Sequence, residues 1–129
     1  MATAKLGSIT RLMTLLGFSP VVASIISILL REKRPLTLNE LSEKTGYAKS
    51  HLSYAIRVLE DKLLVELKRG KRRRIFISLR PEGLEKVIRE HIREIKDHLK
   101  ALVESSSTDL SKRLDHLIKE LDQVAEGGE

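Results

Sequence analysis

The chain has 129 residues, enough for one small domain with an appended element, and 41% of them are hydrophobic, which excludes a disordered tail. It has no cysteine, which excludes disulfides, thiol catalysis and cysteine-ligated zinc and suits the reducing cytoplasm, where we expect the protein to act. The net charge of +6 is uneven, because residues 46–80 carry +7, residues 1–45 carry +3 and residues 81–129 carry −4. A basic block of this kind indicates a polyanionic partner.

The N-terminal region contains nineteen consecutive uncharged residues, 12–30, close to the minimum length of a membrane span. The serine-proline pair at 19–20 divides this run, since such a pair is typical of a helix cap and first turn. The apolar residues after the break have the spacing of one helix face: Val22, Ile25, Ile26, Leu29 and Leu30. We therefore predict a loose terminus over 1–7, a short helix over 8–16 and a core helix over 20–33, with neither a signal peptide nor a membrane span.

The next two helices lie close together in the sequence. Pro35 ends the core helix, and Thr37 and Glu40 then have the spacing of a capping box. The short helix that they start is ended by Gly46. A second helix follows over 49–62, with an apolar face made of Leu52, Ala55, Ile56, Leu59 and Leu63. This spacing predicts a helix-turn-helix.

Alternating apolar and polar residues then predict two strands, 63–68 and 74–79. The loop between them contains Gly70, which is available for the positive φ of a tight hairpin. Six of the seven residues from 68 to 74 are basic, and their mutual repulsion is unfavourable unless a polyanion binds them. We therefore predict that this hairpin contacts DNA phosphates through Lys68, Arg69, Lys71, Arg72, Arg73 and Arg74.

The helix at 49–62 has a second face of polar and basic side chains, opposite its apolar face. Such a helix fits the major groove of DNA, where short polar side chains reach base edges, while a second element holds the phosphates and fixes the register. An ordinary solvated helix surface is the alternative interpretation. Because the basic hairpin follows directly, we predict DNA contacts from Lys49, Ser50, His51, Ser53, Tyr54 and Arg57.

The C-terminal third has the apolar spacing of a coiled coil, with gaps of three and four residues. Whether 82–125 forms one helix or two stays open, because serines interrupt the pattern at 105–107 and Ser107 or Thr108 can cap a restart. These residues pack either on a second copy or on the protein's own core. We predict dimerisation through Leu84, Ile88, Ile92, Ile95, Leu99, Leu102, Leu110, Leu114, Leu117 and Leu121.

Three stretches resemble MarR-type, GbsR-type and TrmB-type winged-helix regulators of prokaryotes: Gly46 to Tyr54, Arg57 to Val65, and Ile77 to Gly83. The first two are similar to the helix-turn-helix core of these regulators, and the third is similar to the exit from their wing. The resemblance implies a DNA-binding transcription factor, usually a homodimer, with the helix at 49–62 in the major groove and the hairpin as a wing at the minor groove. The chain departs from the pattern at Ala48, where a serine or threonine cap is usual, and at Leu63, where a glycine is frequent.

These features predict a mainly α fold with a small β-hairpin wing. A winged helix-turn-helix domain covers 1–83, and coiled-coil-like dimerisation helices cover 84–125. We predict a sequence-specific regulator that binds double-stranded DNA as a homodimer, and a repressor, because a compact binder occludes a promoter. The alternatives are an architectural, chromatin-like DNA-binding protein of low sequence specificity and a winged-helix adaptor between proteins. A small-molecule effector is open, since nothing in the sequence marks a pocket for one.

Other chemistry has weaker support. His91, Glu94 and His98 share one helix face, but three candidate ligands without cysteine are typical of solvated positions beside a coiled-coil seam. We therefore expect no metal and no cofactor. The sequence has no nucleophile elbow, no glycine-rich phosphate loop and no paired acids in a cleft-forming context, so we expect no enzymatic activity.

Overall fold

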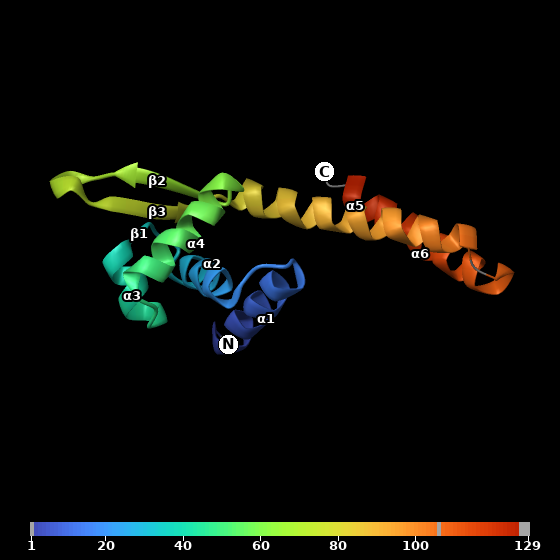
Figure 1. The fold of residues 1–129 in the computed structure, drawn as a ribbon, viewed down its shortest axis with the longest axis horizontal. Helices are drawn as coiled ribbons and strands as arrows, with labels where there is room; N and C mark the ends of the chain where they lie inside the picture. Colours follow the sequence, from blue (N-terminus) through green and yellow to red (C-terminus); the bar gives the residue numbers. More distant parts are fainter. Residues whose placement is uncertain (1, 106, 127–129) are drawn as a thin grey trace. The chain divides into compact units, whose positions relative to one another are not determined.

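The computed structural model describes residues 2–105 and 107–126. Figure 1 shows its elements in chain order: α1 (Ala2–Leu15), α2 (Pro20–Glu32), β1 (Leu36–Thr37), α3 (Leu38–Thr45), α4 (Lys49–Asp61), β2 (Val65–Arg69), the 3-10 turn η1 (Lys71–Arg73), β3 (Ile75–Leu79), α5 (Pro81–Ser105) and α6 (Thr108–Glu126). The chain divides into two compact units, Met1–Leu84 and Glu85–Glu129. Helices with one small antiparallel sheet, followed by C-terminal helices, confirm the predicted winged-helix fold class.

Helix α2 is the centre of the first unit, because most of its side chains are buried. As predicted, Ser19 caps its start, because the Ser19 hydroxyl accepts a hydrogen bond from the Val22 N–H at 3.4 Å. Pro20 is the first residue of the helix. The buried Ser27 hydroxyl donates to a backbone carbonyl one turn earlier at 2.8 Å and lies 3.1 Å from the Thr10 hydroxyl of α1. Helix α1 is therefore held along α2 by a polar contact as well as by apolar packing.

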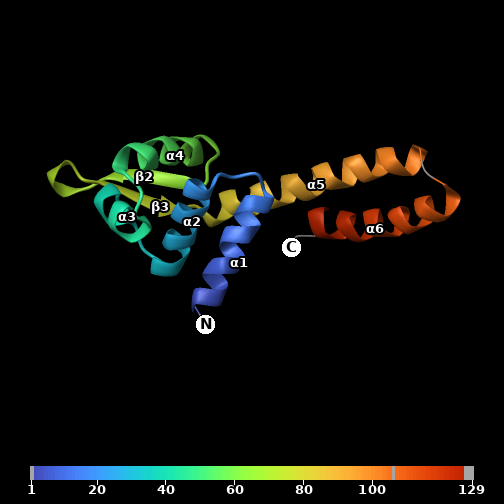
Figure 2. The same cartoon turned by 60° about the horizontal axis from the view of Figure 1, so that its bottom comes forward.

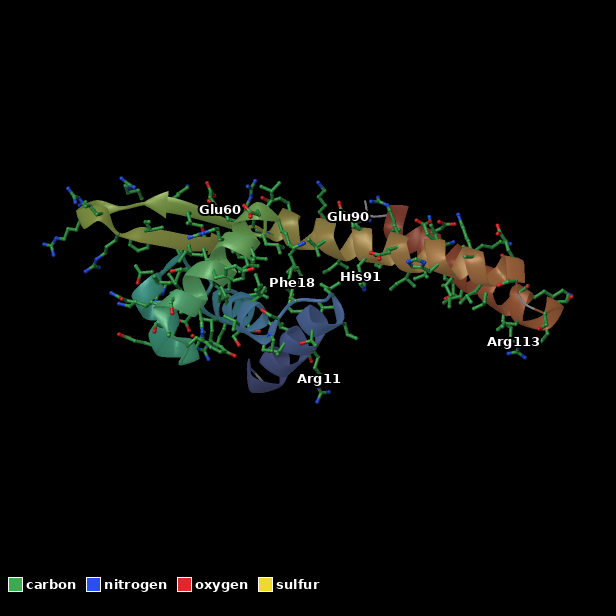
Figure 3. The ribbon with its side chains drawn as sticks, in the orientation of Figure 1. Arg11, Phe18, Glu60, Glu90, His91 and Arg113 are labelled. Carbon is green, nitrogen blue, oxygen red and sulfur yellow. The ribbon has the colours of Figure 1, made fainter. Side chains whose placement is uncertain are left out.

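Helix α1 starts at Ala2, so the predicted loose terminus over 1–7 is wrong. Residues 2–6 contain neither proline nor glycine, and nothing in them stops a helix that the buried Met13 anchors further on. The chain leaves α1 at Gly17, which has a φ of 91°. Phe18 then points toward the end of α4 in Figure 3, where the Lys62 ammonium lies 5.9 Å from its ring centroid.

Helices α3 and α4 form the predicted helix-turn-helix. The capping box is present, since the Thr37 hydroxyl accepts from the Glu40 N–H at 3.2 Å and the Glu40 carboxylate accepts from the Thr37 N–H at 3.1 Å. Gly46 ends α3 with a φ of 81°, and Ala48 precedes α4 without a side-chain cap. Helix α4 packs on α2 and α3 through its buried residues, Leu52, Ala55, Ile56 and Leu59. The opposite face of α4 is therefore exposed to solvent.

The three-stranded sheet has the order β1-β3-β2, and all its pairs are antiparallel. In the β2–β3 hairpin, Val65 pairs with Leu79 and Arg69 pairs with Ile75. Strand β1 was not predicted, because two residues are too short to show an alternating pattern. The hairpin extends past α3 and α4 in both Figure 1 and Figure 2, and it forms the wing.

The wing loop differs from the sequence prediction at its glycine. Gly70 has a φ of −103°, and the positive φ angles lie instead at Arg72 (59°) and Arg73 (62°). Gly70 has a packing role, because a Cβ at this position would lie 2.5 Å from the Cε2 atom of Phe76. A larger residue would displace the phenylalanine ring from the backbone.

The root of the wing contains a second close approach. Leu63 lies outside α4, with a φ of 60° and an exposed side chain, so its predicted place on the apolar face of that helix is wrong. A Cβ on Gly83, in the first turn of α5, would overlap the carbonyl oxygen of Leu63. The Arg80 N–H donates to the Leu64 carbonyl at 2.8 Å beside this contact. The backbone that leads into the wing at residues 63–64 therefore contacts the backbone that leaves it at residues 80–83.

The second unit is an antiparallel hairpin of α5 and α6, drawn in orange and red in Figure 2. The open question over 82–125 is thereby answered: two helices form, and the Ser107 hydroxyl accepts from the Leu110 N–H at 3.5 Å at the start of the second. The Arg89 guanidinium donates to the carbonyls of Val124 and Ala125 at 3.1 and 2.9 Å. This cation satisfies carbonyls in the last turn of α6, which have no partners within the helix.

An ion pair lies inside the same hairpin. The mostly buried Lys96 ammonium lies 2.5 Å from the Asp122 carboxylate, which is partly exposed. The fully apolar part of the contact includes the buried residues Ile118 and Ala125. Among the described residues, no helix is long and apolar enough to cross a membrane.

Candidate nucleic-acid interface

The outward face of α4 presents all six predicted DNA-contacting residues of that helix. Lys49, Ser50, His51, Ser53, Tyr54 and Arg57 are all exposed. Tyr54 is the most prominent apolar surface among them, with 72% of its area accessible. Since the buried face of α4 is fixed against α2 and α3, these side chains are presented on a rigid support.

The wing presents its six predicted basic residues in the same way. Lys68, Arg69, Lys71, Arg72, Arg73 and Arg74 are all exposed, and Figure 3 shows nitrogen-tipped side chains around the far end of the hairpin. The loop is closed by two backbone hydrogen bonds, from Gly70 N–H to the Arg74 carbonyl at 2.7 Å and from Arg74 N–H to the Lys71 carbonyl at 3.2 Å. A closed loop places the arginines at the tip.

The structure brings part of α4 and part of the wing together around one open cleft of about 710 Å³. Ser53 and Arg57 line it from α4, and Arg73 and Arg74 line it from the wing. Lys68 and Arg69 instead line a smaller cavity of about 330 Å³ together with Arg34. Of the twelve predicted residues, the shared cleft groups Ser53, Arg57, Arg73 and Arg74.

Sequence reasoning missed residues at the start of α3. Thr37 and Asn39 line the shared cleft, although they lie far from the wing in the sequence. The capping box at Thr37 was recognised as a helix start only, and strand β1 is what places it beside β3, with Thr37 paired to Phe76. Arg34, next to the smaller cavity, was also missed, although a basic residue before a proline turn was a visible signal.

The charges of the interface are not compensated. Among the described residues, none of its eight basic side chains forms an ion pair: Lys49, Arg57, Lys68, Arg69, Lys71, Arg72, Arg73 and Arg74. Several basic side chains outside the interface do have acidic partners, as Arg34 has in Glu40 at 2.8 Å. Unpaired cations on two adjacent elements make a surface of high positive potential.

Two carboxylates near the interface are already occupied by other cations. The hydrogen bond from Arg34, together with one from the Thr37 backbone, lowers the pKa of Glu40. Partial burial raises the pKa of Glu32, but the charges of Lys44 and Arg31 outweigh it and hold that pKa below its usual value. Both groups therefore stay ionised and neutralise the α2–α3 corner, and they leave the charge of the interface as it is.

His91, Glu94 and His98 lie on α5 at positions i, i+3 and i+7. In the parts of the chain that the structure describes, no group of three or more histidine, aspartate or glutamate side chains is arranged to hold a metal ion. The His98 side chain lies 3.9 Å from that of Glu94. His91, labelled in Figure 3, lies about one turn before Glu94 on α5. The unpaired cations of α4 and the wing can bind anions.

The winged-helix part of the chain is similar to a known protein family. The sequence profile of the MarR family matches residues 16–75, which contain α2, the helix-turn-helix and the wing up to the start of β3. The winged helix is therefore similar to the MarR family over this segment. The matched segment includes every predicted DNA-contacting residue, and the predicted resemblance is confirmed.

Relatives agree with this assignment. YvaV of Bacillus subtilis strain 168, named as an HTH-type transcriptional regulator, is 26% identical over 81% of this chain and 68% of its own length. The crystal structure of the transcriptional regulator Tm0710 from Thermotoga maritima is 26% identical with a TM-score of 0.51, and the match covers 98% of this chain and 90% of that one. A MarR-family regulator from Silicibacter pomeroyi has a TM-score of 0.53 at 20% identity, over 95% of this chain and 83% of that one, and supports the fold alone.

Proposed function

We propose that this protein is a transcriptional regulator that binds double-stranded DNA as a homodimer and acts in the cytoplasm, with no enzymatic role. The observation that carries the proposal is the set of eight unpaired basic side chains on α4 and the wing of a MarR-type domain. Phosphate contacts by such cations supply most of the affinity for DNA. A compact dimer on a promoter blocks access to it, so we propose a repressor.

The cleft between α4 and the wing suits the passage of one DNA strand. With α4 in the major groove and the wing at the neighbouring minor groove, the backbone that separates the two grooves runs between them. Arg57 and Arg74 then lie on either side of that backbone, and Asn39 lies at the positive end of α3. Ser50, Ser53 and Tyr54 remain for contacts with base edges.

The exposed apolar residues of the second unit support the homodimer. On α5, Ile88, Ile95 and Leu102 are spaced by seven residues, and on α6 so are Leu110, Leu117 and Val124. The side chains of the last five are 41% to 55% exposed, and Ile88 is half-buried. Val124 extends the predicted set by one residue. Two stripes of strict heptad spacing need partner helices, and a second copy provides them.

The test is fluorescence anisotropy of a labelled duplex of about 30 base pairs, titrated with protein at salt concentrations from about 50 to 300 mM. We expect the logarithm of the affinity to fall by several units per unit of log salt. Replacing Arg72, Arg73 and Arg74 by glutamine should reduce this slope by about 2 to 3 units for each wing that contacts the duplex, because each phosphate contact contributes about 0.9. The matched control replaces Arg11, Lys112 and Lys119, which are also exposed, and it should leave the slope unchanged.

The outcomes separate this function from its alternatives. Absence of duplex binding at the lowest salt would reject the DNA-binding function in favour of a protein adaptor. Binding with equal affinity to all sequences, even after selection from a random pool, would favour an architectural protein. For a sequence-specific regulator, Ser53→Ala and Tyr54→Phe should change the order of preferred sequences while the salt slope is retained.

A further inference from the structure

The shared cleft contains two carboxylates among its basic side chains, Glu40 and Glu60. The charge of Glu40 is compensated, because the Arg34 guanidinium donates to its carboxylate at 2.8 Å. Glu60 is exposed, and its side chain forms no ion pair among the described residues. One negative charge therefore remains in a cleft proposed to hold phosphates, and attraction by the cations does not explain it.

Glu60 lies at the closed end of the cleft. Helix α4 ends at Asp61, and residues 62–64 connect it directly to Val65 at the root of the wing. The Leu64 N–H donates to the Leu59 carbonyl at 2.9 Å and holds this connection against the helix. Glu60, labelled in Figure 3, is thus next to the place where α4 and the wing join. The arginines of the wing loop lie at the other end of the hairpin.

The charge of the cleft changes along α4. Ser53, Arg57 and Glu60 all line the cleft, and steps of four and three residues place them on one side of the helix. A phosphate beside Arg57 is attracted, whereas a phosphate one turn further toward the root meets the carboxylate of Glu60 and is repelled. The cleft therefore attracts phosphate toward the wing tip and repels it at the root.

We propose that Glu60 is a specificity-determining residue, whose carboxylate repels any phosphate that enters the cleft beyond Arg57. The repulsion limits the DNA strand to one depth between α4 and the wing. A fixed depth also fixes the position of α4 in the major groove, where its other side chains reach base edges. The inference rests on the proposed function, because it concerns the DNA strand that passes through this cleft.

This repulsion acts unequally on different complexes. Complexes with random DNA depend on phosphate contacts, which are available in every register. Shifted registers bring a phosphate near Glu60 and are weakened, whereas the complex with a preferred sequence keeps its phosphate at Arg57 and is not. Glu60 therefore lowers the affinity for random DNA more than the affinity for the preferred sequence, and it raises the ratio of the two affinities.

The test is fluorescence anisotropy of the full chain at about 100 mM salt, where charges are screened beyond about 10 Å. Two duplexes are compared, one of random sequence and one selected by this protein from a random pool. Glu60→Gln should strengthen binding to the random duplex about threefold for each copy in contact, the scale of repulsion between two unit charges a few ångströms apart in water. The affinity for the selected duplex should change by less than about 1.5-fold, so that the ratio of affinities falls.

Asp61→Asn is the matched control. Asp61 is also exposed and is adjacent in the sequence, but it does not line the cleft, so its substitution removes the same charge elsewhere. The control should leave the ratio of affinities unchanged. Glu60→Asp retains the charge in the cleft and should also retain the ratio. Glu60→Ala, with a residue that favours helix, makes the same test if the glutamine variant does not fold.

Unchanged or weaker binding of the random duplex by the Glu60→Gln variant would overturn the inference. An equal fall of the ratio in Asp61→Asn would also overturn it, because net charge alone would then be responsible. Either result leaves the proposed function intact, since the unaltered protein still binds DNA. Failure of the unaltered protein to bind any duplex would instead reject the proposed function and this inference together.

Discussion

Leu63 is the residue at which the chain leaves α4 for the wing, and its backbone has the left-handed conformation that favours glycine. Its N–H donates to the Glu60 carbonyl at 2.9 Å, and its own carbonyl lies against Gly83. These contacts hold the strained conformation in place. The departure from the family pattern at this position therefore puts a leucine in a conformation that costs less energy for glycine.

Leu63→Gly should stabilise the protein by about 0.5 to 1 kcal/mol, because it relieves the left-handed strain and removes a side chain that is 54% exposed. Urea unfolding followed by circular dichroism measures the change. Asp61→Gly, two residues earlier in α4, is the control and should destabilise by about 0.5 to 1 kcal/mol. Equal losses in both variants would show that Leu63 is not strained.

Gly83 is the counterpart of Leu63 on α5. A methyl group there has no space, since it would overlap a backbone carbonyl. Gly83→Ala should therefore lower the melting temperature markedly, and combining it with Leu63→Gly should not restore stability, because the obstructing atom belongs to the backbone. Full stability of Gly83→Ala in a thermal melt would contradict the backbone contact.

At the scale of elements, the start of α3 depends on an ionised carboxylate. The pKa of Glu40 is lowered by Arg34, so its folded-state value lies below its unfolded-state value. The resulting stability is fully present above the unfolded pKa, about 4.3, and is lost as the pH falls through the folded value. Melting temperatures should therefore drop below about pH 4.3, and Glu40→Gln should show a smaller drop. Glu43→Gln, on the same helix, should behave like the unaltered protein.

Elements with local signals were predictable from the sequence. The Ser19 cap, the capping box at Thr37 and the stop at Gly46 each depend on residues at most three positions apart. Features that depend on distant residues were not predictable. Gly70 is explained only by the ring of Phe76, and Leu63 only by the return of the chain at Gly83.

The sequence predicted the exposed residues of the candidate site, but it did not predict which of them line the same cleft. All twelve predicted side chains are exposed, as DNA contact requires. The cleft combines residues from three elements, and its residues at Thr37 and Asn39 enter through β1, which the alternating pattern could not reveal. Ile75 also lines the cleft, but the sequence predicts it only as part of a strand, because alternation does not state which face of a hairpin meets a neighbouring helix.

At the scale of the whole molecule, self-association has its own test. Ile95→Glu combined with Leu117→Glu places charges on both apolar stripes, and we expect the mass from light scattering to fall from that of a dimer to that of one chain. Lys100→Glu with Lys119→Glu, at exposed positions on the same helices, should remain dimeric. A monomeric unaltered protein, or a dimer that tolerates the stripe variant, would reject this interface.

If the dimer forms, DNA affinity depends on both copies. Two wings and two α4 helices would engage half-sites about 34 Å apart. The stripe variant should therefore lose affinity for a two-half-site duplex and retain the affinity of one domain for a single half-site. Equal loss on both duplexes would place the two glutamates in the DNA-binding surface instead.

The exposed basic run of the wing also has a consequence for proteolysis. Trypsin cleaves after lysine and arginine, and Lys71 to Arg74 offer it four consecutive sites in a loop that projects into solvent. A brief digestion should cut the free protein first at the wing, into fragments that end near residue 71 and begin near residue 75. Bound duplex would cover these bonds, so the survival of the intact chain in the presence of DNA reports occupancy of the wing without any label.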